Sequence, residues 1–457
     1  MRSKKLIKAL APIAVSCWTI PAGFCAYSCQ GHVDPEPPTN VLRNVDGSDW
    51  QGREQGHFAP MRDYDIYPTE KEIVYKNSEN LIAQDLVIPN YVLFNNEKYK
   101  VILQEECFFE NYNLTGSIEL NDFMDFVPDQ CFFNAAYLRK VIFHQYPKHV
   151  GYNAFAECIS LSEIYVRQGD ILDPNWTKSI ISIGDNAFEN CRLGDEELTY
   201  SLVFGPALVN IGKYAFSGCT ALVNVCFSFS PEFVELQEGA FFACWSLEKI
   251  TFHDNFYIFG KNCLASCSNL ENVYLPCAKQ IQLSEACFSG CTYLRDLGPH
   301  TEELTFVSVE KQEEKILILK KIPSAAFLEC RSLEHALWEP QHKVVEVGDR
   351  AFDGTPFGKV VIPRSMEHIN YMSFGDMNNL HIVDFSQWDP DSIPDLGPDC
   401  TDAFAGKPSN GQIILPYSEL IYEGWLDFLQ RIGFSYDEIE QGKWQIIPGP
   451  KPPEIKE

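Results

Sequence analysis

Basic residues are scarce in this chain. Its 457 residues include 36 Lys and Arg against 63 Asp and Glu, which gives a formal net charge of −27 at pH 7. No cluster of basic residues offsets this charge locally, so the chain would repel nucleic acid and anionic membrane surfaces. The composition therefore argues against nucleic-acid binding.

Catalytic motifs are missing as well. The sequence contains no nucleophile elbow, no phosphate-binding loop and no His-Glu-x-x-His pair. Its carboxylates are scattered through loops, so the choice of any two as an acid–base couple would be arbitrary. We therefore expect no enzymatic activity, and we assign no catalytic residue and no cofactor.

The N-terminus also lacks an apolar run long enough to cross a bilayer. Its apolar segment, Ala9–Ala22, is short, is interrupted by prolines and follows Lys4, Lys5 and Lys8. This arrangement is typical of an export signal and not of a transmembrane helix. Residues 1–29 are predicted to form that signal.

Cys29 follows Ala26-Tyr27-Ser28, which places small residues three positions and one position before the cysteine. The segment resembles the relaxed lipoprotein signals of Bacteroidetes, which implies that Cys29 is lipidated and that the protein is a surface-exposed outer-membrane lipoprotein. Ordinary secretion after an Ala-x-Ala-like cleavage site is the alternative. The proline-rich acidic segment 30–40 would then be a tether, and a lipid anchor would be the only membrane contact.

A short pattern recurs through most of the chain, as in Ile211–Phe227, IGKYAFSGCTALVNVCF. A small residue and an aromatic are followed after three residues by Cys, after three more by Leu, and then by a short apolar run. The steps between successive copies are mostly 22 to 25 residues. The key aromatic, or leucine in one copy, lies at Phe108, Phe132, Phe155, Phe188, Phe216, Phe241, Leu264, Phe288, Phe327, Phe352, Phe374 and Phe404. Repetition at this period predicts a solenoid.

Most of the 17 cysteines fall on repeat positions. Seven follow the key residue by three, and four occupy the small position before it, so we expect buried free thiols that act as small apolar fillers. Disulfides are the alternative for an exported chain. Cys263, Cys267, Cys287 and Cys291 resemble a four-thiolate zinc site, but they lie on the same columns and we assign no metal. His144 and His149 lack an acidic partner at helical spacing and are expected at the surface.

The pattern resembles the BspA-like leucine-rich repeat family over about residues 86–416. The resemblance implies a β-rich leucine-rich-repeat solenoid, of the α/β right-handed superhelix class, with about twelve coils. Residues 41–85 and 417–457 would cap its two ends, because a terminal repeat otherwise exposes its core. Departures occur at Arg192–Tyr200, which disrupts one coil, and among the coils without the Cys, for example where Thr355, Met377 and Lys407 replace it.

Several segments outside the repeat pattern also have predicted structures. Val92–Phe94 and Tyr99–Leu103 flank an Asn-Asn turn and indicate a hairpin. The insertion Gly298–Lys321 alternates well enough to predict an extra hairpin. The tail is expected to form a short amphipathic helix over Glu419–Gln430 and a terminal strand over Trp444–Ile447.

The strand of each repeat indicates where a ligand could bind. Alternation within each Leu-x-x-Ile-x-Ile unit sends the Ile positions inward and the residues between them outward. We expect one long parallel sheet face, with a merely solvated sheet as the alternative. Candidate ligand-binding residues on that face are Glu163, Tyr165, Asn224, Lys249, Thr251, Asn272, Tyr274, His335 and Lys359. Trp176 and Trp388, on insertions, are candidate loop contacts.

The family resemblance also implies a function. Its members are cell-surface proteins associated with adhesion and with binding of host or microbial proteins. We therefore expect a non-enzymatic recognition scaffold that binds protein ligands through the repeat sheet face and the insertion loops. Glycan capture for nutrient uptake and a purely structural envelope role are the alternatives. Clustered exposed aromatics with polar neighbours would favour sugars, whereas a broad mixed face would favour protein.

Overall fold

The computed structural model of the protein describes residues 43–44, 64–75, 83–194, 201–228, 233–252, 256–274, 280–295, 321–333, 344–390, 393–417 and 423–450. The predicted signal 1–29, Cys29, the tether 30–40, His335 and most of the predicted 298–321 hairpin lie outside these residues. Within them, no helix has the length and apolarity that a membrane crossing requires.

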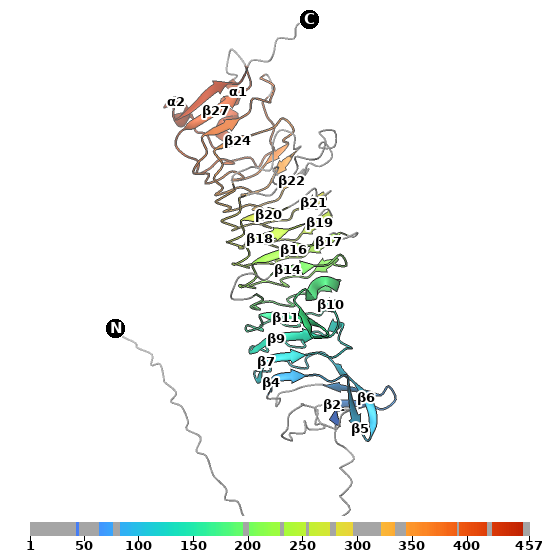
Figure 1. Ribbon diagram of the computed structural model, residues 1–457. Coiled ribbons are helices and arrows are strands. Elements are labelled where there is room, and N and C mark those ends of the chain that lie inside the picture. Colours follow the sequence, from blue (N-terminus) through green and yellow to red (C-terminus); the bar gives the residue numbers. More distant parts are fainter. Residues whose placement is uncertain are drawn as a thin grey trace, which may run out of the picture. The chain divides into compact units, whose positions relative to one another are not determined.

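The repeats form a solenoid in which successive coils pair their strands in parallel (Figure 1). The strand that follows the Leu column belongs to one of three sheets. The first has the order β12-β11-β9-β7-β4, the second β14-β16-β18-β20 and the third β24-β26-β27-β28. Their bounds are β4 Ala83–Val87, β7 Leu114–Glu119, β9 Leu138–Phe143, β11 Glu163–Gln168, β12 Ile171–Asp173, β14 Ser201–Phe204, β16 Asn224–Phe227, β18 Lys249–Thr251, β20 Asn272–Tyr274, β24 Lys359–Val361, β26 Ile382–Asp384, β27 Gly411–Leu415 and β28 Trp444–Pro448.

A second set of short strands precedes the key residues. Seven form one parallel sheet: β8 Phe126–Val127, β10 His149–Val150, β13 Ser182–Ile183, β15 Asn210–Ile211, β17 Val234–Leu236, β19 Phe256–Phe259 and β21 Gln280–Gln282. Three more form another: β22 Lys321–Ile322, β23 Glu346–Val347 and β25 His368–Ile369. The predicted solenoid is thus confirmed, with about ten turns of this kind, slightly fewer than the expected twelve. Among the described residues, the end coils differ: the residues before Phe108 belong to β6 (Glu97–Leu103) in a separate N-terminal sheet, and no strand directly precedes Phe404.

Each key residue lies in a tight turn that is itself a ladder between coils. Around Phe155, the backbone is left-handed at Asn153 (φ 52°) and at Glu157 (φ 63°). The N–H groups of these three residues donate to carbonyls of the next coil at 2.8 to 3.0 Å. Left-handed residues occur two positions before and two after the key residue in every coil. Because left-handed residues flank the pair, the small residue and the key residue both point inward, and Ala154 and Phe155 are fully buried.

The predicted core columns are confirmed. All twelve key side chains are at most 1% exposed, and neighbouring rings stack nearly parallel, as in Phe132–Phe155 with centroids 5.0 Å apart. In five of the twelve coils, a glycine four residues before the key residue lets adjacent coils approach. A Cβ on Gly151 would lie 2.7 Å from the backbone nitrogen of Asp129, closer than any real contact. Glycine is therefore a packing requirement in those five coils.

The cysteine column does more than fill space. All thirteen cysteines that the structure describes are free, as predicted. The thiol of Cys158 donates to the carbonyl of Phe132 in the preceding coil at 3.0 Å, and the other six column cysteines make the equivalent bond at 3.0 to 3.2 Å. Burial raises the pKa of the column thiols Cys158, Cys219 and Cys330. These groups are hydrogen-bonded structural thiols.

The N-terminal end is covered by a five-stranded sheet of order β1-β5-β6-β3-β2. The predicted hairpin is confirmed as β5 (Tyr91–Phe94) paired antiparallel with β6 (Glu97–Leu103). Its turn residues Asn95 and Asn96 have φ of 51° and 63°, as a type I′ turn requires. The other strands are β1 (Arg43–Asn44), β2 (Tyr64–Tyr67) and β3 (Glu72–Tyr75).

The tail forms α1 (Glu423–Arg431), α2 (Tyr436–Glu440) and β28, so its predicted helix and terminal strand are confirmed. Lys407, which replaces the column cysteine in the last coil, anchors this tail. Its buried ammonium donates to the carbonyl of Gly433, contacts the Glu438 carboxylate at 3.2 Å and lies 4.8 Å from the Phe434 ring centroid. In the last coil a lysine therefore replaces the column cysteine, and its ammonium group binds the C-terminal cap.

Candidate functional site

The strands alternate as predicted. In β11, Ile164 and Val166 are buried, while Glu163 and Tyr165 are half-buried on the outer side. In β18, Ile250 is buried between the outward Lys249 and Thr251. Asn224, Asn272 and Lys359 also lie outward, and the backbone of Tyr274 pairs with Thr251. Except for Tyr274, the outward orientation of these candidate residues is established, and ligand binding by all of them stays a prediction.

The prediction of one continuous sheet face is wrong for the described residues. Glu163 and Tyr165 lie on the first sheet, Asn224 through Tyr274 on the second, and Lys359 on the third. The first break has a clear cause, because after β11 the chain reverses into β12, which pairs antiparallel with Val166–Gln168. β12 thereby occupies the edge that the next coil's strand would need.

The two candidate tryptophans are held by the protein itself. Trp176 lies in a short 3-10 helix, η2 (Trp176–Ser179), is 1% exposed and packs 5.3 Å from the Phe188 ring. The prediction of Trp176 as a loop contact is therefore wrong, because its ring fills the core beside an insertion. Trp388 is half-buried, and its indole N–H donates to the Ile362 carbonyl at 3.0 Å.

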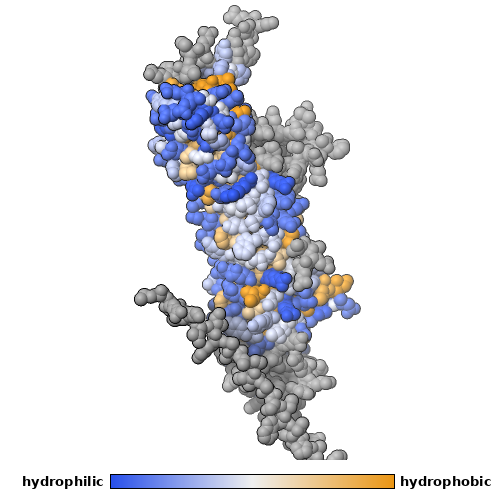
Figure 2. Space-filling model, turned by 90° about the vertical axis from the view of Figure 1, so that its left-hand side faces the viewer, coloured by the Kyte–Doolittle hydropathy of each residue, from blue (hydrophilic) through white to orange (hydrophobic). Residues whose placement is uncertain are grey.

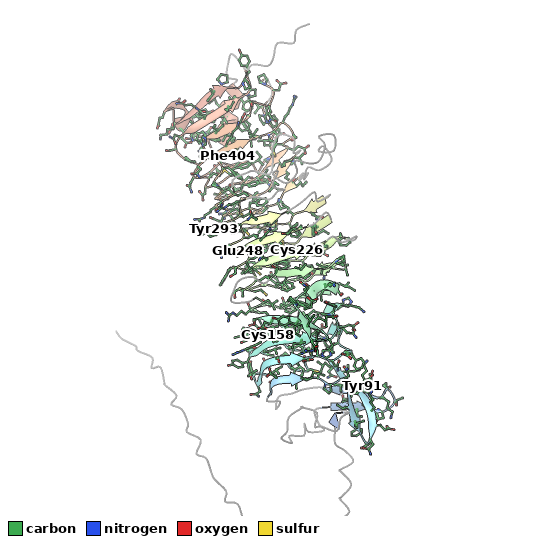
Figure 3. All side chains as sticks on the ribbon, in the orientation of Figure 1. Tyr91, Cys158, Cys226, Glu248, Tyr293 and Phe404 are labelled. Atoms are coloured by element: carbon green, nitrogen blue, oxygen red, sulfur yellow. The ribbon has the colours of Figure 1, made fainter. Side chains whose placement is uncertain are left out.

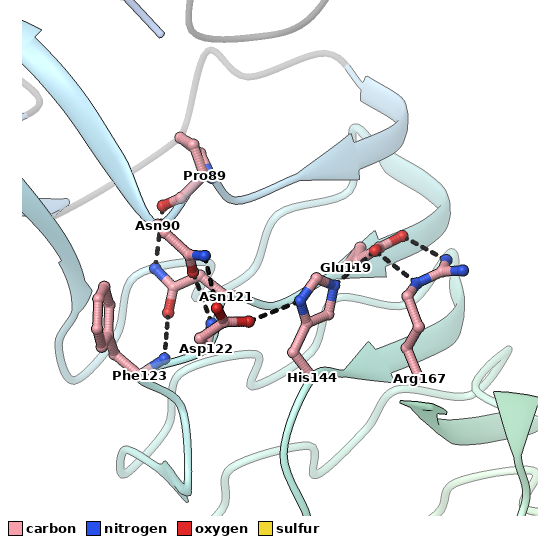
Figure 4. A network of polar contacts seen from close by, with 8 residues as sticks. All are labelled: Pro89, Asn90, Glu119, Asn121, Asp122, Phe123, His144 and Arg167. Carbon is pink, nitrogen blue, oxygen red and sulfur yellow. Dashed lines mark hydrogen bonds and ion pairs between the residues drawn. The ribbon is translucent and has the colours of Figure 1, made fainter. Parts of the chain in front are cut away.

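A polar network covers the outer face of the first sheet (Figure 4). Arg167 of β11 donates twice to Glu119 of β7, with both distances 2.8 Å, and so bridges across the intervening β9. His144, just after β9, places one ring nitrogen 2.6 Å from Glu119 and the other 2.8 Å from Asp122. Ionised carboxylates only accept hydrogen bonds, so both contacts form together only when His144 carries both ring protons. Three adjacent strands are thus tied by paired charges.

The network lowers the pKa of Glu119. Partial burial alone would raise it, but the hydrogen bonds and positive charges of Arg167 and His144 outweigh burial, and the pKa lies below its usual range. As expected, His144 has no acidic partner at helical spacing, but it does have two acidic partners from another coil. Its partners stand 22 and 25 residues earlier, in the preceding coil, and not at helical spacing.

Exposed apolar side chains recur at one corner of the coils, at the fourth and fifth residues after the key residue. These positions lie where the chain leaves the tight turn and enters the next strand. We call them the corner row, and it consists of Tyr112, Tyr137, Ile159, Trp245 and Tyr293, each 49 to 57% exposed. These positions lie between the Cys and Leu columns, where the repeat pattern specifies no residue type. Large aromatics at these positions were the signal that could have found them.

The N-terminal part of the corner row is continuous with neighbouring aromatics. Phe109 and Phe133, half-buried in successive coils, stack with ring centroids 5.0 Å apart. Asn134 donates to the Tyr112 hydroxyl at 2.7 Å. A cavity of about 180 Å³ beside Tyr137 is lined by Thr115, Gly116, Tyr137 and Arg139. We call Phe109, Tyr112, Phe133, Tyr137 and Ile159 the N-terminal patch.

The central part of the corner row differs. Trp245 and Tyr293 stand in coils separated by one further coil, which places Ser268 and Asn269 between them. Figure 3 shows Tyr293 and Glu248 at the same left-hand edge of the coils. We call Trp245 and Tyr293, with the small residues between them, the central corner. Among the described residues, no group of three His, Cys, Asp or Glu side chains converges as a metal site would require.

The repeat signature is matched by a family model, the BspA type leucine rich repeat region, in six copies over residues 94–200, 181–310 and 303–393. The chain belongs to the BspA-type leucine-rich repeat family. The resemblance inferred from the sequence is therefore confirmed. BspA-type proteins are generally cell-surface proteins, and their repeats form scaffolds.

Solved structures similar to this BspA-type chain include other bacterial leucine-rich repeat proteins. One from Bacteroides ovatus is 18% identical, covers 84% of this chain and 97% of its own, and has a TM-score of 0.49. A leucine rich cell surface protein from Faecalibacterium prausnitzii is 14% identical, with 78% and 95% covered and a TM-score of 0.41. The pneumococcal vaccine antigen PcpA is 13% identical, with 83% and 93% covered and a TM-score of 0.36. No curated protein matches the chain.

Proposed function

We propose that this BspA-type protein is a non-enzymatic recognition scaffold at the cell surface that binds proteins of host or microbial surfaces through its N-terminal patch. The observation that carries the proposal is a run of exposed apolar side chains on three successive coils. Tyr112, Tyr137 and Ile159 are each about half exposed, and Phe109 and Phe133 of the first two of these coils stack on each other. Exposed apolar patches on soluble domains mark interaction sites.

The surroundings of the patch suit a protein partner. Its apolar centre is bordered by exposed Glu110 and Arg139 and by the amide of Asn134, an arrangement of apolar core and polar rim typical of protein interfaces. The small cavity beside Tyr137 could receive an anchoring side chain of the partner. The residues stand on hydrogen-bonded turns, so little conformational entropy is lost when a partner binds.

The experiment is capture of surface proteins on the purified protein, followed by titration of each captured protein after separate purification. The triple variant Tyr112→Ala, Tyr137→Ala, Ile159→Ala should weaken binding by roughly thirtyfold or more, because truncating an interface hot spot costs about 2 kcal/mol. Tyr371→Ala, which removes a tyrosine of similar exposure from another position of the repeat, is the matched control. Equal affinity of the triple variant and the control would contradict the proposal.

The proposed display at the outer membrane depends on lipidation of Cys29, the last residue of the predicted signal segment 1–29. Cys29→Ser should move the protein from the membrane fraction to the soluble fraction, because the acyl chains supply the anchor. Metabolic labelling with a fatty acid, compared between the two proteins, identifies the lipid directly. Unchanged membrane retention of the variant would reject Cys29 as the anchor, while leaving the binding proposal open to its own test.

A further inference from the structure

The central corner presents two aromatic rings that are exposed and separate. Trp245 is 57% and Tyr293 53% exposed, the first following Phe241 and the second following Phe288. The intervening Leu264 coil places Ser268 and Asn269 at the same positions. The Thr292 hydroxyl and the Tyr293 N–H both donate to the Ser268 carbonyl, at 3.2 and 3.3 Å. The backbone beneath Tyr293 is therefore fixed to the intervening coil.

The coil spacing sets the distance between the rings. Neighbouring strands of a sheet lie about 4.8 Å apart, so aromatics two coils apart are held roughly 10 Å from each other. On the turn side of the row, the second residue after each key position is Ala243, Ser266 and Gly290 in these three coils. All three are small, so a ligand could lie flat across the turn side of this corner.

Polar side chains border the opposite, strand side. Glu248, Glu271 and Arg295 are exposed on successive coils. Their backbones are in register, because Glu271 N–H donates to Glu248 O at 3.0 Å and Arg295 N–H donates to Glu271 O at 3.1 Å. These side chains form a line of hydrogen-bond acceptors followed by a donor, beside the two rings.

We propose that the central corner binds a neutral oligosaccharide, with Trp245 and Tyr293 each stacking on a pyranose ring. One face of a pyranose ring presents C–H groups that pack on an aromatic ring, while its hydroxyls point sideways to polar groups. Glu248, Glu271 and Arg295 would accept from and donate to those hydroxyls. A ligand with apolar faces at intervals and hydroxyls along its edge fits this alternation of ring, small residue and ring.

Two observations select this ligand class. A protein partner needs a continuous apolar centre, whereas Figure 2, which faces this edge, shows mainly pale and blue residues over the middle of the chain and only small orange patches. The formal charge of −27, with two carboxylates at the site, disfavours acidic polysaccharides and leaves neutral ones. The site goes beyond the proposed protein recognition and lies on different coils.

The test is binding of the full chain to an array of neutral and acidic oligosaccharides, followed by titration with each oligosaccharide that binds. Trp245→Ala and Tyr293→Ala should each weaken binding about five- to tenfold, the range expected for the loss of one aromatic stacking contact. Trp245→Phe should retain most of the affinity, because a ring remains. The triple variant of the N-terminal patch should bind sugar like the wild type, which separates this proposal from protein recognition.

Three results would overturn the inference. The first is no binding to any neutral oligosaccharide. The second is sugar binding that survives the double variant Trp245→Ala, Tyr293→Ala at unchanged affinity. The third is a protein ligand, and no sugar, whose binding is lost in this double variant. The thermal unfolding of Trp245→Phe and of each alanine variant, compared with wild type, shows whether a loss of binding is local.

Discussion

The N-terminal patch and the central corner use the same two positions of the repeat and present different surfaces. In the first, Tyr112, Tyr137 and Ile159 follow one another on successive coils beside the stacked Phe109 and Phe133. In the second, Ser268 and Asn269 separate two single rings. The turns that carry both are alike, with left-handed residues on either side of every key residue. The fold is therefore constant along the corner row, and side-chain identity alone changes the chemistry.

The outer face of the first sheet differs from the corner row in another way. Its charged groups are already paired, since Glu119, Asp122, His144 and Arg167 form a single network. A ligand bound there would have to displace internal ion pairs, which costs desolvation and lost hydrogen bonds. The exposed rings of the corner row are uncharged, so a ligand there would displace no ion pair, although Tyr112 accepts one hydrogen bond from Asn134. The comparison favours the corner over the sheet face as the place of recognition.

The N-terminal patch and the central corner should rest on one continuous core of stacked aromatic rings. Truncating a ring between them has the largest effect that we expect and tests this continuity. Phe188 stands between them, stacked on Phe155 and Phe216 with centroids 5.2 Å away on each side, and contacts Trp176. Phe188→Ala should destabilise the fold by about 3–5 kcal/mol, the usual cost of removing a buried phenylalanine. Urea unfolding followed by circular dichroism measures this, with Tyr293→Ala as an exposed control.

In a solenoid each coil contacts only its neighbours, so such a defect can separate the two stretches. Hydrogen exchange of the Phe188→Ala variant should show β9 and β16 losing protection by different amounts. Uniform loss along the chain would indicate global cooperativity. A cost below about 1 kcal/mol would mean that the aromatic stack is not the main support of the core.

The core could be predicted because its pattern is local. Small residue, aromatic, Cys and Leu recur at fixed spacings, and each spacing corresponds to a position within one coil, so stacking followed directly. The hairpin at Asn95-Asn96 and the tail helix were predicted for the same reason, since turn chemistry and amphipathic spacing act over a few residues. Structural features that depend only on residues close together in the sequence can therefore be predicted from it.

The remaining features depend on contacts between coils whose separation along the chain varies. Glu119 and Arg167 are 48 residues apart, across a whole intervening coil. Trp176, on an insertion, packs in the core beside Phe188, and the spacing of the repeats does not show where an insertion packs. β12 ended the first sheet because its residues reversed direction after β11. Side-chain pairing between coils and the direction in which an insertion runs could be determined only from the structure.

A smaller effect would distinguish the N-terminal coils from the central coils by their response to acid. The Glu119 pKa is lowered in the folded protein, so its contribution to stability is complete above the unfolded value, about 4.3, and is lost as pH falls through the folded value. Since the ion pair is partly exposed, we expect a loss of about 1 kcal/mol. Protection factors of β7, β9 and β11 should fall between pH 5 and pH 3 more than those of β16 and β18. Glu119→Gln should already show lower protection in the first sheet at pH 5 and no extra acid sensitivity there, and an equal fall in both sheets of the wild type would refute this role of the network.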